Sequence, residues 1–206
     1  MSRKEEIIYA TLELASEYGL KAVSMAQIAD RIGIKKPSLY NHCKSKEEIV
    51  SEMYAFLREN ARKKNTVTAD FTSLFDGRTL EEILSLSLSG YMQFLTVPAM
   101  LCFFKVLYAE RSTSQEAAQI MLEETECMVR NTKALFYALV VHGKMRNEDI
   151  DTAAMSYAMT IHSLVDLQMD RMTAERAGVP EAAVPSAEMQ AYIRWFSKQM
   201  GVDAHE

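Results

Sequence analysis

The chain contains few of the residues that form turns: seven glycines and four prolines among 206 residues. β-Sandwiches and β-barrels depend on frequent turns, so this scarcity argues against a β-rich fold. Hydrophobic residues make up 49% of the chain and charged residues 25%, which are ordinary values for a globular protein that buries a sizeable core. Together these features favour an all-α protein.

Cysteine is also scarce, and the chain has only Cys43, Cys102 and Cys127. Three is an odd number, and the cysteines lie too far apart for the spacing of a metal site. No stretch approaches the roughly 18 apolar residues of a membrane-spanning helix, and the residues after Met1 are polar, so we expect no signal peptide. The sequence therefore predicts a reduced, cytoplasmic chain that has no metal site and does not enter a membrane.

Sequence motifs of enzymes are missing as well. The chain has no glycine-rich phosphate loop, no His-x-x-x-His metal pair and no nucleophile elbow. His162 and Asp166 lie one helical turn apart, but such pairs are frequent on helices and carry little weight. We therefore expect a protein that is not an enzyme and that needs no cofactor.

The charges that are present are divided unequally along the chain. Residues 1–64 hold 12 basic and 9 acidic side chains, whereas residues 65–206 hold 11 and 19. Within residues 21–46, six basic residues accompany a single acid, Asp30. A local excess of positive charge is what a surface that binds nucleic-acid phosphates requires.

Residues 24–46 have the pattern of two short helices joined by a tight turn. Ser24 and Gln27 are spaced as a capping box at the start of the first helix. Gly33 permits a left-handed turn, and Pro37 suits the first turn of the second helix. This order is that of a helix-turn-helix motif, whose second helix enters the DNA major groove.

Helical spacing of apolar residues continues along the rest of the chain, and we find no convincing strand. Including the two helices of residues 24–46, we expect about nine helices. The others are predicted over about 3–18, 45–64, 79–95, 98–109, 113–141, 147–176 and 186–200.

Several residues in the first quarter of the chain resemble the DNA-binding signature of TetR-family transcriptional regulators. They are Ile28-Ala29, Gly33-Ile34, Ser38-Leu39-Tyr40-Asn41-His42 and Lys44-Ser45-Lys46-Glu47. The resemblance implies a three-helix DNA-binding head in residues 1–46 and a helical ligand-binding and dimerisation body in residues 47–206, with helix 47–64 connecting the two.

The resemblance also implies roles for individual residues. Ser24, Tyr40 and Lys46 match positions that contact phosphate, although the Tyr40 ring can also pack on the head's own core. The full set predicted to contact DNA is Ser24, Lys36, Pro37, Ser38, Tyr40, Asn41, His42 and Lys46.

Two residues depart from the family pattern. Cys43 stands where phenylalanine is usual, and Lys35 stands where a helix-capping serine or threonine is common. Cys43 is therefore expected to fill less of the core of the head than phenylalanine would. A buried structural thiol is favoured over a redox sensor.

The C-terminal part of the chain is rich in methionine, with eleven of the fourteen methionines after residue 64. Core packing is the simpler explanation for any one of them, but methionine is also common at adaptable binding surfaces. The resemblance implies a pocket for a small apolar or amphipathic effector. The candidate lining residues are Phe104, Tyr108, Met128, Tyr137, Met159 and His162, the last of which is more simply a core histidine.

The last two predicted helices carry apolar stripes that a partner chain would cover in a TetR-like homodimer. The candidate interface residues are Tyr157, Ile161, Val165, Tyr192, Ile193 and Phe196. The alternative is that both stripes face the chain's own core. A two-fold dimer would read palindromic double-stranded DNA with half-sites about 34 Å apart, or a multiple of that.

The sequence thus indicates a sequence-specific, DNA-binding transcriptional regulator. The resemblance to the TetR family favours a repressor that is released from DNA by a small effector. The alternative is a DNA-binding regulator without such an effector, which is controlled by a protein partner.

Overall fold

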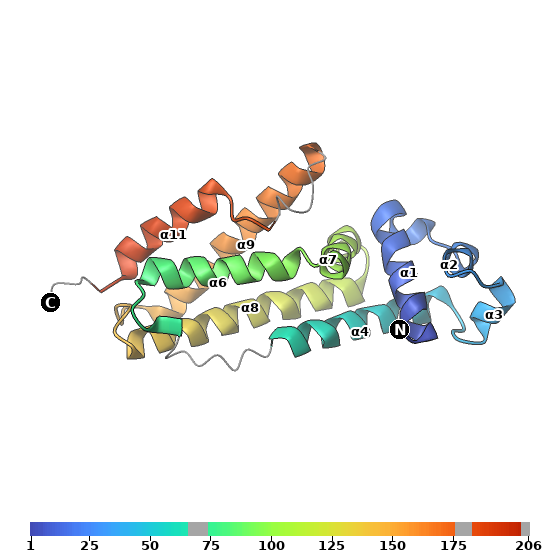
Figure 1. The fold of residues 1–206 in the computed structure, drawn as a ribbon, viewed down its shortest axis with the longest axis horizontal. Coiled ribbons are helices and arrows are strands. Elements are labelled where there is room, and N and C mark those ends of the chain that lie inside the picture. The colour runs from blue at the N-terminus through green and yellow to red at the C-terminus, as the bar shows by residue number, and fades with distance from the viewer. Residues whose placement is uncertain (66–73, 176–182, 203–206) are drawn as a thin grey trace. The chain divides into compact units, whose positions relative to one another are not determined.

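The computed structural model describes residues 1–65, 74–175 and 183–202. Within these ranges the protein is all-α, with nine α-helices, one short 3-10 helix and a single isolated β-bridge (Figure 1). The elements are α1 (Arg3–Tyr18), η1 (Leu20–Ala22), α2 (Met25–Arg31), α3 (Lys36–Tyr40), α4 (Lys46–Asn65), α6 (Leu80–Leu95), α7 (Pro98–Glu110), α8 (Gln115–Val141), α9 (Ile150–Glu175) and α11 (Ala187–Met200). The all-α fold class predicted from the sequence is confirmed.

Helix starts lie close to the capping signals in the sequence. Ser24 and Thr79 complete capping boxes at the starts of α2 and α6. α8 begins at Gln115 rather than near residue 113, because Ser114 caps its first turn. The Ser114 hydroxyl accepts a hydrogen bond from the backbone N–H of Ala117 at 3.2 Å.

The chain divides into two compact units. The N-terminal unit comprises Met1–Val67 and Val97–Met121, and the C-terminal unit comprises Thr68–Thr96 and Leu122–Glu206. The predicted division at residue 46 groups α4 with the C-terminal body, whereas in the structure α1 packs against both α4 and α7 (Figure 1). The reason is that the apolar stripe of α4 is buried within the N-terminal unit.

A continuous apolar core holds the N-terminal unit together. Its fully buried side chains come from α1, α2, α3, α4 and α7: Ile8, Leu12, Ile28, Leu39, Met53 and Phe103. Since α2 and α3 are too short to be stable alone, their shape depends on this shared core.

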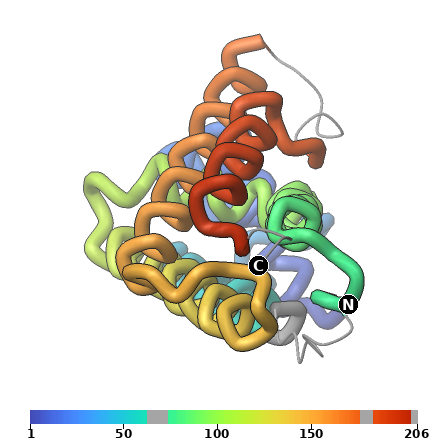
Figure 2. Tube along the Cα trace, turned by 90° about the vertical axis from the view of Figure 1, so that its left-hand side faces the viewer, coloured from blue at the N-terminus to red at the C-terminus, as the bar shows by residue number. Residues whose placement is uncertain are grey.

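The C-terminal unit is built from α6, most of α8, α9 and α11. α11 lies beside α9, as the orange and red segments of Figure 2 show, and it also packs against α6. Four aromatic rings, from Phe136, Tyr157, Tyr192 and Phe196, meet in this unit with ring centroids 5.0–6.0 Å apart. Aromatic clusters of this kind contribute a large share of core stability.

The described helices differ in length and in apolar character from membrane-spanning segments. No single helix there is long and apolar enough to cross a membrane, and α6 and α7 reach the required length and composition only when they are counted together.

Candidate nucleic-acid interface

The turn between α2 and α3 depends on Gly33. Its φ angle is +69°, a conformation that costs other residues about 1–2 kcal/mol. The turn is closed by backbone hydrogen bonds from Gly33 N–H to Asp30 O at 3.0 Å and from Ile34 N–H to Ala29 O at 2.9 Å. The glycine therefore sets the direction in which α3 leaves α2.

The recognition helix α3 is only five residues long and is held by its packing. Leu39 is completely buried and anchors the helix in the core of the N-terminal unit. Lys35, at the N-cap, makes no capping hydrogen bond with its side chain, as the sequence predicted. Because local capping is missing, the burial of Leu39 is what fixes the orientation of α3.

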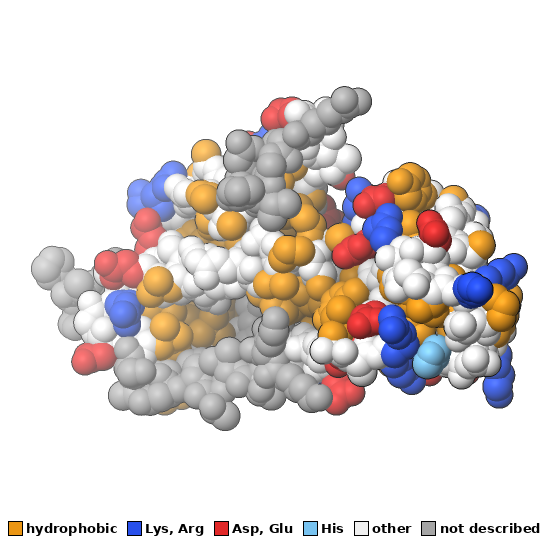
Figure 3. Space-filling view, turned by 45° about the vertical axis from the view of Figure 1, so that its right-hand side comes forward, with side chains coloured by type: hydrophobic (Ala, Val, Ile, Leu, Met, Phe, Trp, Pro, Cys, Tyr) orange, Lys and Arg blue, Asp and Glu red, His pale blue; other side chains and the backbone are white. Residues whose placement is uncertain are grey.

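Seven of the eight residues predicted to contact DNA are exposed to solvent. They are Ser24, Lys36, Pro37, Ser38, Tyr40, Asn41 and His42. The Tyr40 side chain is 48% exposed, so its hydroxyl group is available to a phosphate even though part of the ring packs on the unit. Lysine and arginine side chains gather over this part of the chain, as the blue atoms of Figure 3 show. Contact with DNA itself stays a prediction.

Lys46 differs from the other seven residues because it is half-buried and its ammonium group is already hydrogen-bonded within the chain. Its ammonium group donates hydrogen bonds to the backbone oxygens of Leu20 at 3.1 Å and Val23 at 3.0 Å. These two residues lie in and next to η1, directly before α2. Lys46 therefore ties the start of α4 to the segment that leads into the helix-turn-helix, a role that the sequence did not indicate.

Replacing Lys46 with methionine is expected to destabilise the N-terminal unit by about 1–3 kcal/mol, because two carbonyl oxygens lose a charged donor. Lys44, which is exposed, provides the matched control. Lys44→Met should change the free energy of unfolding by less than about 0.5 kcal/mol. Urea unfolding of both variants tests this difference, and equal free energies of unfolding would show that Lys46 is not a structural tie.

The positive charge of the head is smaller than the sequence suggests. Arg31 forms ion pairs with Glu13 at 3.1 Å and Glu17 at 3.5 Å, both on α1. These carboxylates offset the charge of one of the six basic residues in the 21–46 segment. Four exposed lysines are left to attract phosphates: Lys21, Lys35, Lys36 and Lys44.

Cys43 is a core residue directly behind α3. It is buried, and its thiol donates a hydrogen bond to the Leu39 carbonyl oxygen at 3.4 Å. Burial raises the pKa of the thiol, and the carboxylates of Glu48 and Glu52 raise it further. A thiol with a raised pKa is rarely a thiolate and reacts slowly, so the environment favours a structural role for Cys43.

A short exposed helix behind a glycine turn, with lysines around it, is the arrangement of a helix-turn-helix DNA-binding module. Family models place the chain more narrowly. Residues 7–53 match the bacterial regulatory proteins of the tetR family, and residues 82–197 match the C-terminal domain of AefR-like transcriptional repressors. The chain belongs to the TetR family of transcriptional regulators, which are not enzymes.

Individual relatives agree with this assignment. The HTH-type transcriptional repressor KstR2 of Mycolicibacterium smegmatis is 42% identical over 52 residues, which is 25% of each chain. The chain thus spans about a quarter of the length of that curated relative. Solved structures extend the likeness to the whole fold.

Two solved structures illustrate this likeness. A TetR-family transcriptional regulator from Mesorhizobium loti superimposes with a TM-score of 0.70 at 20% identity, over 98% of this chain and 100% of that chain. The ketosteroid transcriptional regulator KstR2 of Mycobacterium tuberculosis gives a TM-score of 0.58 at 20% identity, over 98% and 96%. At these identities the likeness shows the fold alone.

The six residues predicted to line an effector pocket are divided between the two units. Phe104 and Tyr108 belong to the N-terminal unit, and the other four belong to the C-terminal unit. Tyr137 and Met159 are exposed, and the Tyr137 hydroxyl donates a hydrogen bond to Asp151 at 2.9 Å. These two side chains therefore do not line an enclosed cavity, whereas Met128 and His162 are half-buried.

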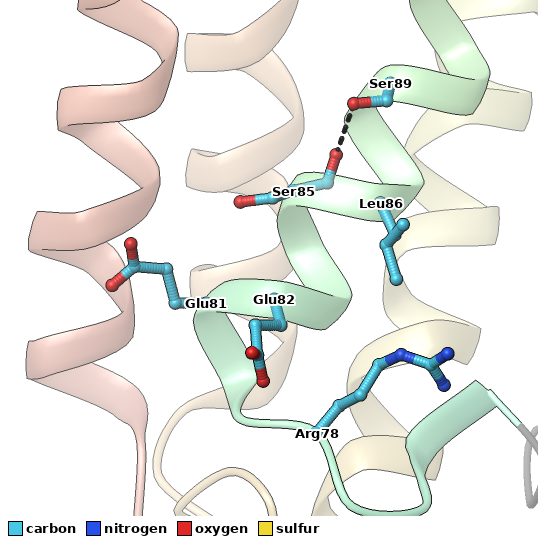
Figure 4. Close-up of a pocket in the computed structure, with 6 residues that line it drawn as sticks. All are labelled: Arg78, Glu81, Glu82, Ser85, Leu86 and Ser89. Carbon is cyan, nitrogen blue, oxygen red and sulfur yellow. Dashed lines mark hydrogen bonds between the residues drawn. The ribbon is translucent and has the colours of Figure 1, made fainter.

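A hollow of about 370 Å³ lies on α6 instead (Figure 4). It is lined by Arg78, Glu81, Glu82, Ser85, Leu86 and Ser89, none of which was predicted from the sequence. The Ser89 hydroxyl is already bonded to the Ser85 carbonyl oxygen at 2.9 Å, and Glu82 is occupied in the capping box of α6. This hollow is therefore an open surface feature, with Leu86 as its one large apolar side chain, and it lacks the enclosing walls of an effector pocket.

The predicted dimer stripes face the chain's own core. Five of the six residues are buried within the C-terminal unit, namely Tyr157, Ile161, Val165, Ile193 and Phe196, and Tyr192 is half-buried. Their apolar spacing marks the core side of α9 and α11, which was the alternative interpretation. The opposite sides carry exposed apolar residues, none of which was predicted to lie in an interface: Met155, Met159 and Leu167 on α9, and Trp195 on α11.

Proposed function

We propose that this chain is a dimeric transcriptional repressor that binds a palindromic operator through α3 and the residues around it. The single observation that carries the proposal is the exposure of seven predicted contact residues around a recognition helix whose Leu39 is fully buried. The repressor names of the relatives and of the C-terminal family model support the sign of regulation. A DNA-binding regulator of this family acts in the cytoplasm, which is the location we infer.

Dimerisation is proposed to use the outer faces of α9 and α11. Trp195 is 56% exposed, and three apolar side chains of α9 are exposed as well. Tryptophan and methionine are enriched in protein interfaces, and Trp195 is the single tryptophan of the chain. Two heads related by a two-fold axis would then read the two halves of a palindrome.

Release from DNA is proposed to follow the binding of a small amphipathic effector in the C-terminal unit. A largely buried polar group supports this idea: burial, together with the carboxylates of Asp166 and Glu124, raises the pKa of Tyr91 to about 12. His162 lies beside Asp166, with 3.9 Å between Nε2 and Oδ2. These residues come from α6, α8 and α9, and their polar groups would hold the polar end of a ligand. The effector would lower DNA affinity by favouring a conformation that binds the operator poorly.

A gel shift with the DNA directly upstream of the gene tests the proposal. Wild-type protein should bind a fragment that contains an inverted repeat, and Asn41→Ala should bind it at least about tenfold more weakly if the amide contacts a base, a loss of about 1.4 kcal/mol. Fragments selected from random DNA provide the second substrate. A wild-type protein that binds neither fragment would contradict the proposal.

The alternative is a regulator controlled by a protein partner. A panel of apolar and amphipathic molecules distinguishes the two, because only an effector-controlled repressor releases DNA when one of them is added. Release by the partner alone would support the alternative.

A further inference from the structure

The burial of Leu39 fixes which side of α3 points away from the protein. Leu39 is completely inaccessible to solvent, so its direction marks the inner side of the helix. Asn41 has φ and ψ angles of −74° and −16°, and the helical geometry of α3 therefore continues to this residue. Successive residues of an α-helix are rotated by about 100° around its axis. The direction of each residue from Lys36 to Asn41 can therefore be derived from that of Leu39.

Two residues point most nearly opposite to Leu39. Pro37 lies two positions before it and Asn41 two positions after it, and each is rotated from it by about 160°. They are four residues apart, so they are neighbours on the outermost side of α3. Both are exposed to solvent. When α3 enters a major groove, this pair therefore faces the edges of the bases.

The residues between and beside this pair take other directions. Ser38 and Tyr40 are rotated by about 100° from Leu39, one to each flank of the helix. Lys36 is rotated by only about 60° and stays closer to the body of the unit. The phosphate backbones border a groove on both sides, so these three positions suit contacts with phosphate better than contacts with bases.

The chemistry of the outer pair favours A·T base pairs. The proline side chain has no hydrogen-bonding atom, and the apolar group that the major groove offers is the 5-methyl group of thymine. The asparagine amide matches adenine, since its oxygen accepts from N6 and its nitrogen donates to N7. Within the described part of the chain, no hydrogen bond occupies the Asn41 amide.

Side chains that read guanine are missing from the outer side of α3. Arginine makes the commonest specific contact with guanine, and residues 32–44 contain no arginine. Arg31 precedes the turn and is paired with Glu13 and Glu17 on α1. The outer side of α3 is therefore suited to an A·T-rich part of a half-site.

We propose that Pro37 and Asn41 determine the specificity of operator binding by reading two A·T base pairs in each half-site. The Pro37 ring contacts the 5-methyl group of a thymine, and the Asn41 amide forms two hydrogen bonds with an adenine. Four residues of α-helix span about 6 Å, so the two base pairs are at most about two steps apart. The inference rests on the proposed operator binding and goes beyond it by naming the bases that are read.

The test uses the full-length protein and an operator that it selects from random DNA. In one half-site each thymine is replaced in turn by deoxyuridine, which lacks only the 5-methyl group, and each adenine by 7-deazaadenine, which lacks N7. Fluorescence anisotropy gives the affinities of wild type, Pro37→Ser, Asn41→Ala and Tyr40→Phe. Tyr40→Phe is the control, because it loses a hydroxyl group on the flank of α3 and keeps both outer side chains.

For wild type, deoxyuridine at one thymine should weaken binding about fourfold, which corresponds to one methyl group that is no longer buried. At an adenine no more than about two steps away, 7-deazaadenine should weaken binding about fivefold through the loss of one hydrogen bond. Pro37→Ser should be insensitive to the first replacement and Asn41→Ala to the second. Tyr40→Phe should bind every duplex more weakly and keep both sensitivities.

These outcomes separate base reading from a purely structural role, because a proline that only starts the helix would not make binding depend on one methyl group. The inference is overturned if the selected half-site has no such thymine and adenine, or if Pro37→Ser and Asn41→Ala keep the wild-type sensitivities. In both cases wild type still binds its operator and the proposed function stands. If the protein selects no sequence at all, operator binding is contradicted as well.

Discussion

Replacing Leu39 with alanine is expected to destabilise the N-terminal unit by about 2–5 kcal/mol and to abolish operator binding. Leu39 is the only residue of α3 that is buried, and it is completely inaccessible to solvent. Removing its side chain leaves a cavity behind a helix of five residues, which has no other anchor of comparable size. The helix would lose its fixed orientation even if the rest of the unit stayed folded.

The neighbouring residue supplies the matched control. Tyr40 is 48% exposed, so Tyr40→Ala should change the free energy of unfolding by less than about 1 kcal/mol. It should still weaken DNA binding, because the proposed contact of the Tyr40 hydroxyl with a phosphate would be lost. Hydrogen exchange and urea unfolding measure the stability of both variants. A large loss of stability in Tyr40→Ala, together with a small one in Leu39→Ala, would contradict the assignment of inner and outer faces to α3.

Replacing Phe196 with alanine is expected to destabilise the C-terminal unit by about 3–5 kcal/mol. Its ring lies 5.5 Å from that of Phe136 and 5.0 Å from that of Tyr157, measured between centroids, and the side chain is 4% exposed. The cluster is a core feature, so the loss should appear even at concentrations at which the protein is monomeric. Chemical unfolding followed by the fluorescence of Trp195, the single tryptophan, measures it directly.

Trp195→Ala, at the residue next to Phe196, is the matched comparison. This side chain is on the outer face of α11, so its removal should leave the stability of the monomer nearly unchanged and weaken self-association at least about tenfold, or about 1.4 kcal/mol. Sedimentation at several concentrations measures the association constant. If Phe196→Ala, rather than Trp195→Ala, specifically weakens association without a loss of stability, the stripe on α11 is an interface after all.

Much of the fold could be predicted because its signals are local. Ser24 and Thr79 indicate helix starts because each begins a capping box. Gly33 indicates a left-handed turn because it has no side chain. The recognition helix is a different case, since five residues that include a proline have little helical tendency of their own. It was indicated by the turn at Gly33, by Pro37 and by the resemblance of its residues to those of a known family, and its conformation is imposed by the burial of Leu39.

The parts that escaped prediction depend on which neighbour covers a given surface. The apolar spacing on α9 and α11 shows that one face of each helix is buried. The spacing is the same whether the chain's own core or a second copy of the chain buries that face. Lys46 looks like a phosphate ligand by its position, and only the fold reveals that the carbonyl oxygens of Leu20 and Val23 surround its ammonium group. The ion pairs of Arg31 with α1 are hidden from the sequence for the same reason.

The most direct test of the central claim, that α3 and its flanks form the DNA-binding surface, is the salt dependence of operator binding. Wild type, Lys36→Ala and Lys133→Ala are compared by fluorescence anisotropy across a range of salt concentrations. Lys133 is a matched control because it lies in the C-terminal unit, paired with Asp151 at 2.9 Å, and its loss changes the net charge equally. Lys36→Ala should reduce the slope of log K against log salt by about one unit, and Lys133→Ala should leave it unchanged. Equal slopes for all three proteins, or a reduced slope for Lys133→Ala alone, would contradict the account.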